Sequence, residues 1–189
     1  MKITTAIYDA NTLYPAPLRD LLIRLAQAGL VQARWTDAIH DEWIRNVLTK
    51  NPRLTPDQLA RTRDRMNQAV RDCLVTGYQP LIPSLSLPDP DDRHVLAAAI
   101  RAGARVIVTY NLKDFPAENL TGFDVEAWHP DDFLVELLDA APGQFCDAVK
   151  RQRESLRNPP YSAGELLATF ERLGLTQTVA LLREFIAVL

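Results

Sequence analysis

Acidic and amide side chains follow two runs of the sequence that are predicted to be buried strands. Asp9 comes directly after the β-branched and aromatic run Ile3–Tyr8, and Asn111 and Asp114 come directly after Ala104–Thr109. In an open parallel sheet, ligands bind at the edge where the carboxyl ends of the strands meet. These side chains are therefore expected to lie together and to form a polar site. For Asp9 alone, an Asx turn or a helix cap is the alternative interpretation.

Asp92 continues the apolar face of a predicted helix. The run Asp89-Pro90-Asp91-Asp92 is typical of a helix start, with Asp89 at the N-cap and Pro90 at the first position. Favourable interaction with the helix dipole could account for the acidic residues here. However, positions 92, 95, 96, 99 and 100 share one face, and the last four are Val, Leu, Ala and Ile. A buried carboxylate needs a partner, and a metal ion would serve.

Glu42 stands at the edge of a second apolar face. A helix is predicted from Thr36, a plausible N-cap, to about residue 48, with Ile39, Trp43 and Val47 as its apolar stripe. Glu42 flanks that stripe, so it is a candidate ligand at the edge of the core. Without the other carboxylates, the favoured interpretation is an ordinary surface glutamate whose stem packs on the core.

Several carboxylates without a convincing nucleophile point to a hard cation. Cys73 and Cys146 are isolated from one another and from histidine, and the three histidines form no triad, which argues against zinc and against nucleophilic catalysis. Mg²⁺ and Mn²⁺ prefer oxygen ligands and usually keep several waters. Such a cluster can generate hydroxide from bound water and offset the charge on a phosphodiester. The pattern therefore predicts metal-dependent phosphodiester chemistry.

The alternation of strands and helices predicts an α/β fold with a mostly parallel sheet of about five strands, covered on both faces. The predicted strands are Ile3–Tyr8, Val31–Trp35, a short one at Leu81–Ile82, Ala104–Thr109 and Phe123–Trp128, and the helices between them span 18–28, 36–48, 56–74 and 89–102. Beyond Pro130 only helices are predicted, at 131–138, 144–156, 165–173 and 177–188. We expect a first domain over residues 1–130 and an all-helical extension over residues 131–189.

The overall charge of the chain is mildly acidic. It has 21 Lys and Arg against 24 Asp and Glu, a formal net charge of −3, which counts against a generic nucleic-acid binder. Two local stretches, Arg61–Arg71 and Lys150–Arg157, are rich in arginine and could contact phosphates, or could simply be solvated helix faces. No run of eighteen apolar residues and no signal-peptide pattern is present, so a cytoplasmic protein without membrane contact is expected.

Four stretches of the sequence resemble, in order and spacing, the motifs of the PIN-domain family, and in particular its VapC toxins. They are Tyr8–Leu13, Trp35–Leu48, Asp89–Ala99 and Val108–Phe115. The fourth is similar to the T-x-N-x-x-D-F motif of VapC toxins, with Thr109, Asn111 and Asp114 at the corresponding positions. Asn111 stands where many PIN nucleases have Asp, which weakens the case for a second metal ion. The helical tail resembles the C-terminal extension of a longer VapC-type subgroup.

This resemblance implies a PIN-like three-layer fold and a ribonuclease that uses Mg²⁺ or Mn²⁺ and leaves 5′-phosphate and 3′-hydroxyl ends. It implies an RNA substrate, a cognate antitoxin and a homodimer. The residues that it marks are the catalytic set Asp9, Glu42, Asp92 and Asp114, the first three as metal ligands, with Asn11, Asp89, Thr109 and Asn111 in support. Arg61 and Arg65, one turn apart on a predicted helix, are the candidates for RNA contact.

Two other functions remain open from the sequence. The first is a PIN-fold nuclease that acts on DNA or on a particular nucleic-acid structure. The second is a PIN scaffold that binds RNA or protein and whose metal site is vestigial. Joint retention of Asp9, Glu42 and Asp92 argues against the second.

Overall fold

The computed structural model describes residues 4–189, and its centre is a parallel four-stranded sheet in the order β2-β1-β3-β4. The strands are β1 (Thr4–Tyr8), β2 (Val31–Arg34), β3 (Val106–Val108) and β4 (Glu126–Trp128). β1 is central, since Ala6 pairs with Ala33 of β2 on one side and with Val106 of β3 on the other. Ile3, the first residue of the predicted strand, lies outside the described residues.

Helices follow the strands along residues 10–123. They are α1 (Ala10–Leu13), α2 (Ala16–Gln27), α3 (Asp37–Lys50), α4 (Pro56–Ala69), α5 (Arg93–Ala102) and α6 (Ala117–Leu120), with 3-10 turns η1 (Gln79–Ser84), η2 (Pro90–Asp92), η3 (Leu112–Asp114) and η4 (Thr121–Phe123). The Thr36 side chain caps α3, and Thr55 with Gln58 forms a capping box at α4. Gly103 ends α5 in the left-handed conformation, with a φ of 60°.

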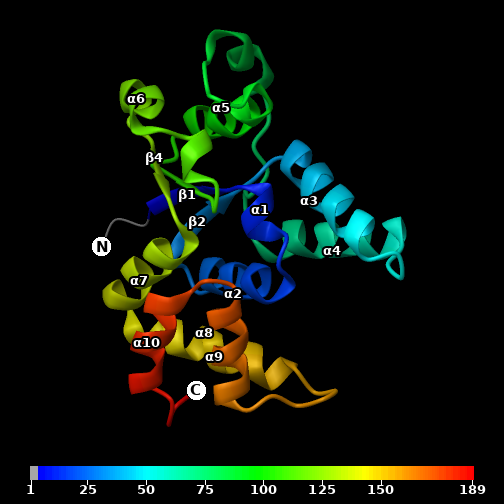
Figure 1. Ribbon diagram of the computed structural model, residues 1–189, viewed down its shortest axis with the longest axis vertical. Coiled ribbons are helices and arrows are strands. Elements are labelled where there is room, and N and C mark those ends of the chain that lie inside the picture. Colours follow the sequence, from blue (N-terminus) through cyan, green and yellow to red (C-terminus); the bar gives the residue numbers. More distant parts are fainter. Residues whose placement is uncertain (1–3) are drawn as a thin grey trace.

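Helices cover the sheet on both sides. In Figure 1, α5 lies above the sheet and α2 below it, and α3 and α4 form an arm that projects to one side. Ile7 of β1 and Ile107 and Val108 of β3 have no exposed surface, as expected for the middle of a doubly covered sheet. The prediction of an α/β fold with a covered parallel sheet is confirmed.

Two details of the prediction are wrong. Leu81 and Ile82, predicted as a short strand, lie in η1, so residues 4–189 contain four strands rather than five. Pro80 and Pro83 lack the N–H groups that a strand donates to its ladder. The helix predicted to reach residue 74 ends at Ala69, and Asp72 beyond it has a φ of 54°.

The C-terminal residues form four helices, as predicted: α7 (Pro130–Ala140), α8 (Pro142–Ser155), α9 (Ala163–Arg172) and α10 (Thr176–Glu184). Their side chains Phe133, Phe145 and Phe170 are buried in the same apolar core as the sheet. Gln152 of α8 donates to the carbonyl of Pro17, at 2.8 Å, and so fastens α8 to α2. The tail therefore packs on the body. No helix within residues 4–189 combines the length and the apolar character needed to cross a membrane.

Candidate active site

Asp9 and Thr109 lie side by side at one edge of the sheet. Each is the residue that directly follows a strand, Asp9 after β1 and Thr109 after β3, and these strands are paired. The ladder continues past the strands, because the amide of Asp9 donates to the carbonyl of Val108 at 3.1 Å. The carboxyl ends of two central strands thus place both side chains where a doubly wound sheet binds its ligands.

Hydrogen bonds hold the carboxylate of Asp9 in one orientation. Its Oδ1 accepts from the amide of Ala10 at 2.6 Å. Its Oδ2 accepts from Asn11 Nδ2 at 2.6 Å and from the Thr109 hydroxyl at 2.7 Å. Asp9 is only 3% exposed. Asp9 also caps the single turn of α1. A carboxylate can accept about four hydrogen bonds, so its three donors leave one acceptor position free for a cation.

Asn11 joins the two strand ends. Its Nδ2 also donates to the Thr109 hydroxyl at 2.9 Å, while its Oδ1 accepts from the amide of Tyr110 at 3.0 Å. The Thr109 hydroxyl accepts in turn from the amide of Asn111 at 3.0 Å. Asn11 and Thr109 therefore orient Asp9, whereas the side chain of Asn111 is exposed.

Glu42 approaches this edge from α3. It is partly buried, and its Oε2 lies 3.7 Å from Nε2 of His94, which stands two residues after Asp92. Burial raises the pKa of Asp9 to about 6; the hydrogen bond from Thr109 opposes the rise, and the charge of Glu42 adds to it. Glu42 is thus close enough for its charge to act on Asp9.

Asp92 is surrounded by acidic side chains. It ends η2, directly before α5, and is half-buried. Burial raises its pKa to about 7, and the rise is reinforced by the charges of Asp9, Asp89, Asp114 and Glu42. The other four acidic residues marked in the sequence thus each lie close enough for their charge to act on Asp92. Because like charges repel one another, neighbouring carboxylates disfavour ionisation of Asp92. A cation between the carboxylates would offset this repulsion.

The carboxylates do not form a closed ion cage. Within residues 4–189, no three His, Cys, Asp or Glu side chains converge on a point at which they could hold one ion. The donor set nevertheless suits Mg²⁺, which takes oxygen ligands at about 2.0–2.1 Å and usually keeps several waters, or Mn²⁺, which also prefers oxygen ligands. Glu42 and Asp92 are partly exposed and can rotate or bind through water, whereas Asp9 is fixed.

Two residues near the site make contacts that the sequence did not predict. His94 faces Glu42, and its Nδ1 is buried without a hydrogen-bond partner in the described part of the chain. The Tyr110 hydroxyl donates to the carbonyl of Leu173 in the tail, at 2.9 Å. Both lie within the third and fourth sequence motifs, but only the folded chain shows their partners. Arg61 and Arg65 lie apart from this cluster, on exposed positions of α4.

Residues 5–113, more than half of the chain, match the model of the PIN domain, and the chain belongs to that family. Residues 130–184 match the VapC50 C-terminal domain, which confirms the resemblance of the tail to a VapC-type extension.

A curated relative is "Putative ribonuclease VapC50" of Mycobacterium tuberculosis (strain ATCC 25618 / H37Rv), which is 41% identical over 91 residues. That match covers 48% of this chain and 53% of the relative, so it spans about half the length of each. No solved structure matches the chain.

Proposed function

We propose that the chain is a VapC-type endoribonuclease that hydrolyses RNA phosphodiester bonds with Mg²⁺ or Mn²⁺. The observation that carries the proposal is the buried carboxylate of Asp9, oriented by three hydrogen bonds and close to the carboxylates of Glu42 and Asp92. Membership of the PIN family and the printed name of the relative support it.

Each side chain has a distinct task in this proposal. Asp9 and Asp92 bind the ion directly, and Glu42 binds it or orients the attacking water. When bound, the ion supplies an activated water and offsets the negative charge of the phosphodiester. Asn11 and Thr109 hold Asp9 in place through the hydrogen bonds described above. Their orientation of Asp9 removes the need for it to reorganise during the reaction.

The remaining acidic and amide groups complete the site. Asp114 lies in η3, beyond β3, and its charge acts on Asp92. We assign it, with Asn111, to the outer ligands or to the waters around the ion. Asp89 accepts from the amide of Asp91 at 2.9 Å, so its first role is to form the turn that presents Asp92.

The biological setting follows from the same family. We infer that the protein acts in the cytoplasm as a homodimer and that a cognate antitoxin restrains it. The domain division at about residue 130 belongs to this proposal too, although the apolar core is continuous across it.

Cleavage of matched oligonucleotides tests the substrate class. We expect the protein to cut single-stranded RNA in Mg²⁺ or Mn²⁺, to leave DNA of the same sequence intact, and to be inactive in EDTA. Cleavage of DNA at a similar rate would favour the DNA-directed alternative. Absence of cleavage together with retained RNA binding would favour the binding module.

A further inference from the structure

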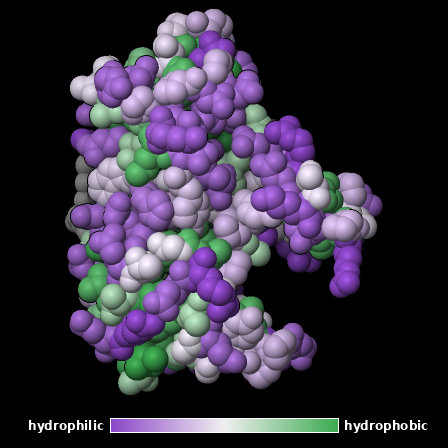
Figure 2. Space-filling model, viewed as in Figure 1, coloured by the Kyte–Doolittle hydropathy of each residue, from purple (hydrophilic) through white to green (hydrophobic). Residues whose placement is uncertain are grey.

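A groove of about 880 Å³ lies between the body and the tail. Its walls come from α2, α4, the end of α8, the segment 156–161 that follows it, and α9. Figure 2 shows it as the deep notch between the projecting arm and the lower, C-terminal part of the molecule. Because Arg65 contributes one wall and Arg157 another, the groove exists only when the tail is docked.

The groove is positively charged on an acidic chain. Four arginines line it, Arg19, Arg24, Arg65 and Arg157, against one carboxylate, Asp20. Asp20 is engaged by Arg24, at 3.1 Å. Arg65 and Arg157 are exposed, and neither has an acidic partner within residues 4–189. This concentration of cations, in a chain of net charge −3, favours an anionic occupant.

The basic lining continues along α4. A second hollow, of about 580 Å³, shares Arg19, Thr62 and Arg65 with the groove and extends to Arg61. Arg61 and Arg65, the candidates from the sequence, therefore lie on one connected track. Neither hollow is lined by a carboxylate of the candidate active site.

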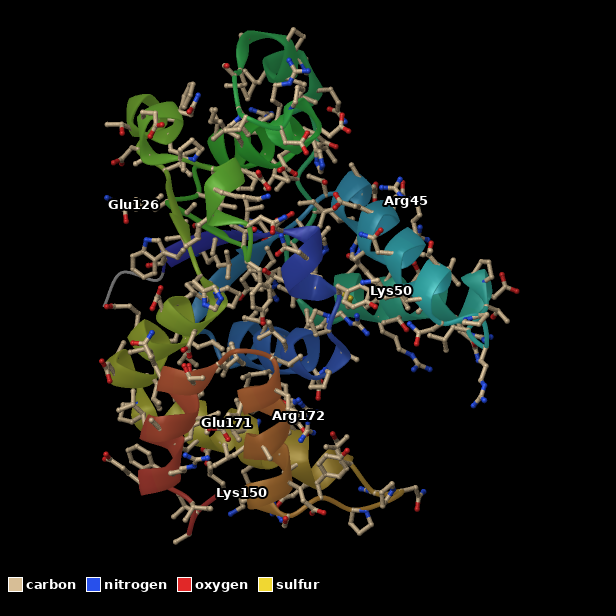
Figure 3. All side chains as sticks on the ribbon, in the orientation of Figure 1. Arg45, Lys50, Glu126, Lys150, Glu171 and Arg172 are labelled. Atoms are coloured by element: carbon tan, nitrogen blue, oxygen red, sulfur yellow. The ribbon has the colours of Figure 1, made fainter. Side chains whose placement is uncertain are left out.

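One end of the track meets the elements that carry the catalytic carboxylates. Arg19 donates to the carbonyl of Leu13 at 2.7 Å, and Leu13 ends the single turn of α1 that Asp9 begins. The Arg19 guanidinium also lies 4.6 Å from the ring centre of Trp43, the residue after Glu42. Figure 3 shows Lys50, at the end of α3, above the notch. The track thus begins at an arginine that binds the end of α1, the turn that Asp9 caps, and contacts the residue after Glu42.

We propose that this groove binds single-stranded RNA on one side of the scissile bond, with phosphates against Arg65 and Arg157. The proposal rests on the ribonuclease function above. The planar fork of arginine suits phosphate oxygens. Tyr161, half-buried in the groove wall, offers a ring on which a base can stack, and such stacking is the usual way to hold unpaired RNA. The tail therefore forms half of the substrate site.

Fluorescence anisotropy with a labelled single-stranded RNA of about 12 nucleotides tests the groove. The measurement is made in EDTA so that the strand stays intact. Each neutralised phosphate contributes a slope of about −0.7 to the dependence of log affinity on log salt. The Arg65→Ala/Arg157→Ala variant should bind at least about tenfold more weakly in low salt and lose about 1.4 from that slope. Tyr161→Leu should weaken binding by roughly tenfold without changing the slope.

The matched control is Arg101→Ala/Arg151→Ala, which removes the same charge from exposed positions outside the groove. It should bind RNA nearly as the unmodified protein does. Equal RNA affinity and slope in the groove and control variants, with circular dichroism unchanged, would overturn the proposal. The proposal would also be overturned if an acidic, leucine-rich helical peptide bound the groove more tightly than RNA and if the Arg65→Ala/Arg157→Ala variant lost that binding.

Failure of the ribonuclease function gives a different result. If no RNA is cut in Mg²⁺ or Mn²⁺ while the groove variant still loses RNA binding, the groove stands and the catalytic proposal falls. If RNA is cut and the groove variant binds and cuts it as the control does, the groove proposal falls by itself.

Discussion

The Tyr110 hydroxyl donates a 2.9 Å hydrogen bond to the carbonyl of Leu173, and this bond ties the tail to the loop that follows β3. Tyr110 is also connected to the candidate active site, because its amide donates to Asn11, which in turn donates to Asp9. Its ring packs edge-to-face with that of His129 at the start of α7, with ring centres 5.0 Å apart. The tail is thus joined to the same few residues that orient the buried carboxylate.

Tyr110→Phe should lower the free energy of unfolding by about 1 kcal/mol, because it removes one hydrogen bond and leaves the Leu173 carbonyl without that donor. Urea denaturation followed by circular dichroism measures the loss. Tyr161→Phe is the control, since the Tyr161 hydroxyl makes no hydrogen bond within residues 4–189. A loss of the same size in both variants would show that the bond to Leu173 contributes nothing specific.

Asp131→Asn should destabilise the tail. The buried carboxylate of Asp131 accepts from the amides of Gln177 and Thr178, at 2.8 and 2.9 Å, and from the Thr178 hydroxyl at 2.7 Å. An amide side chain would turn an N–H group toward one of these donors and lose the charge. We expect a cost of about 2 kcal/mol, against less than about 0.5 kcal/mol for the exposed neighbour Asp132→Asn. Equal urea midpoints for the two variants would contradict this role.

The stability of the metal-free protein should depend on the protonation of two carboxyl groups. Burial, together with neighbouring carboxylates, raises the pKa of Asp92 to about 7 and that of Asp9 to about 6, above the ordinary value of 3.8. Between about pH 4 and pH 7 the folded protein therefore holds protons that the unfolded chain has released. Stability from these groups is present at low pH and is lost as the pH rises through that window.

Denaturation in EDTA at about pH 5 and about pH 8 measures this dependence. The unmodified protein should lose stability at the higher pH relative to the lower, and Asp92→Asn should show a smaller loss, since it no longer titrates. If Asp92→Asn keeps the full pH difference, Asp92 is not the group responsible.

Divalent ions should stabilise the protein more at high pH than at low pH. Protons and the cation compete for the same carboxylates, so binding of Mn²⁺ strengthens as Asp9 and Asp92 ionise. The rise in melting temperature on adding Mn²⁺ should therefore be larger near pH 8 than near pH 5. It should be much reduced in Asp9→Asn at both pH values. An equal rise in Asp9→Asn would place the ion elsewhere.

Local pattern predicted the parts of this site that depend on nearby residues. Asp9 at the end of a buried run and Asp92 on an apolar face are local signals, and the structure places both at least partly out of water. Pro80 and Pro83 are the local signal against a third strand, and they outweigh the short apolar pair between them, which lies in η1.

Relationships over long sequence separations could not be predicted in this way. Tyr110 and its partner Leu173 are 63 residues apart, and neither carries a pattern that names the other. The groove combines Arg65 with Arg157, whose side chains meet the same space only because α8 packs on α2. Here the tertiary fold, rather than local propensity, determines which residues act together.

Cleavage by carboxylate variants tests the central claim most directly. Single-turnover cleavage of RNA in Mg²⁺ or Mn²⁺ should fall at least about a hundredfold in Asp92→Asn and in Asp9→Asn, while the exposed neighbour Asp91→Asn stays near the unmodified rate. The double variant should be scarcely worse than either single one, because the carboxylates act as a unit. Near-normal cleavage in Asp92→Asn, with unchanged circular dichroism, would contradict the assignment of this edge of the sheet as the active site.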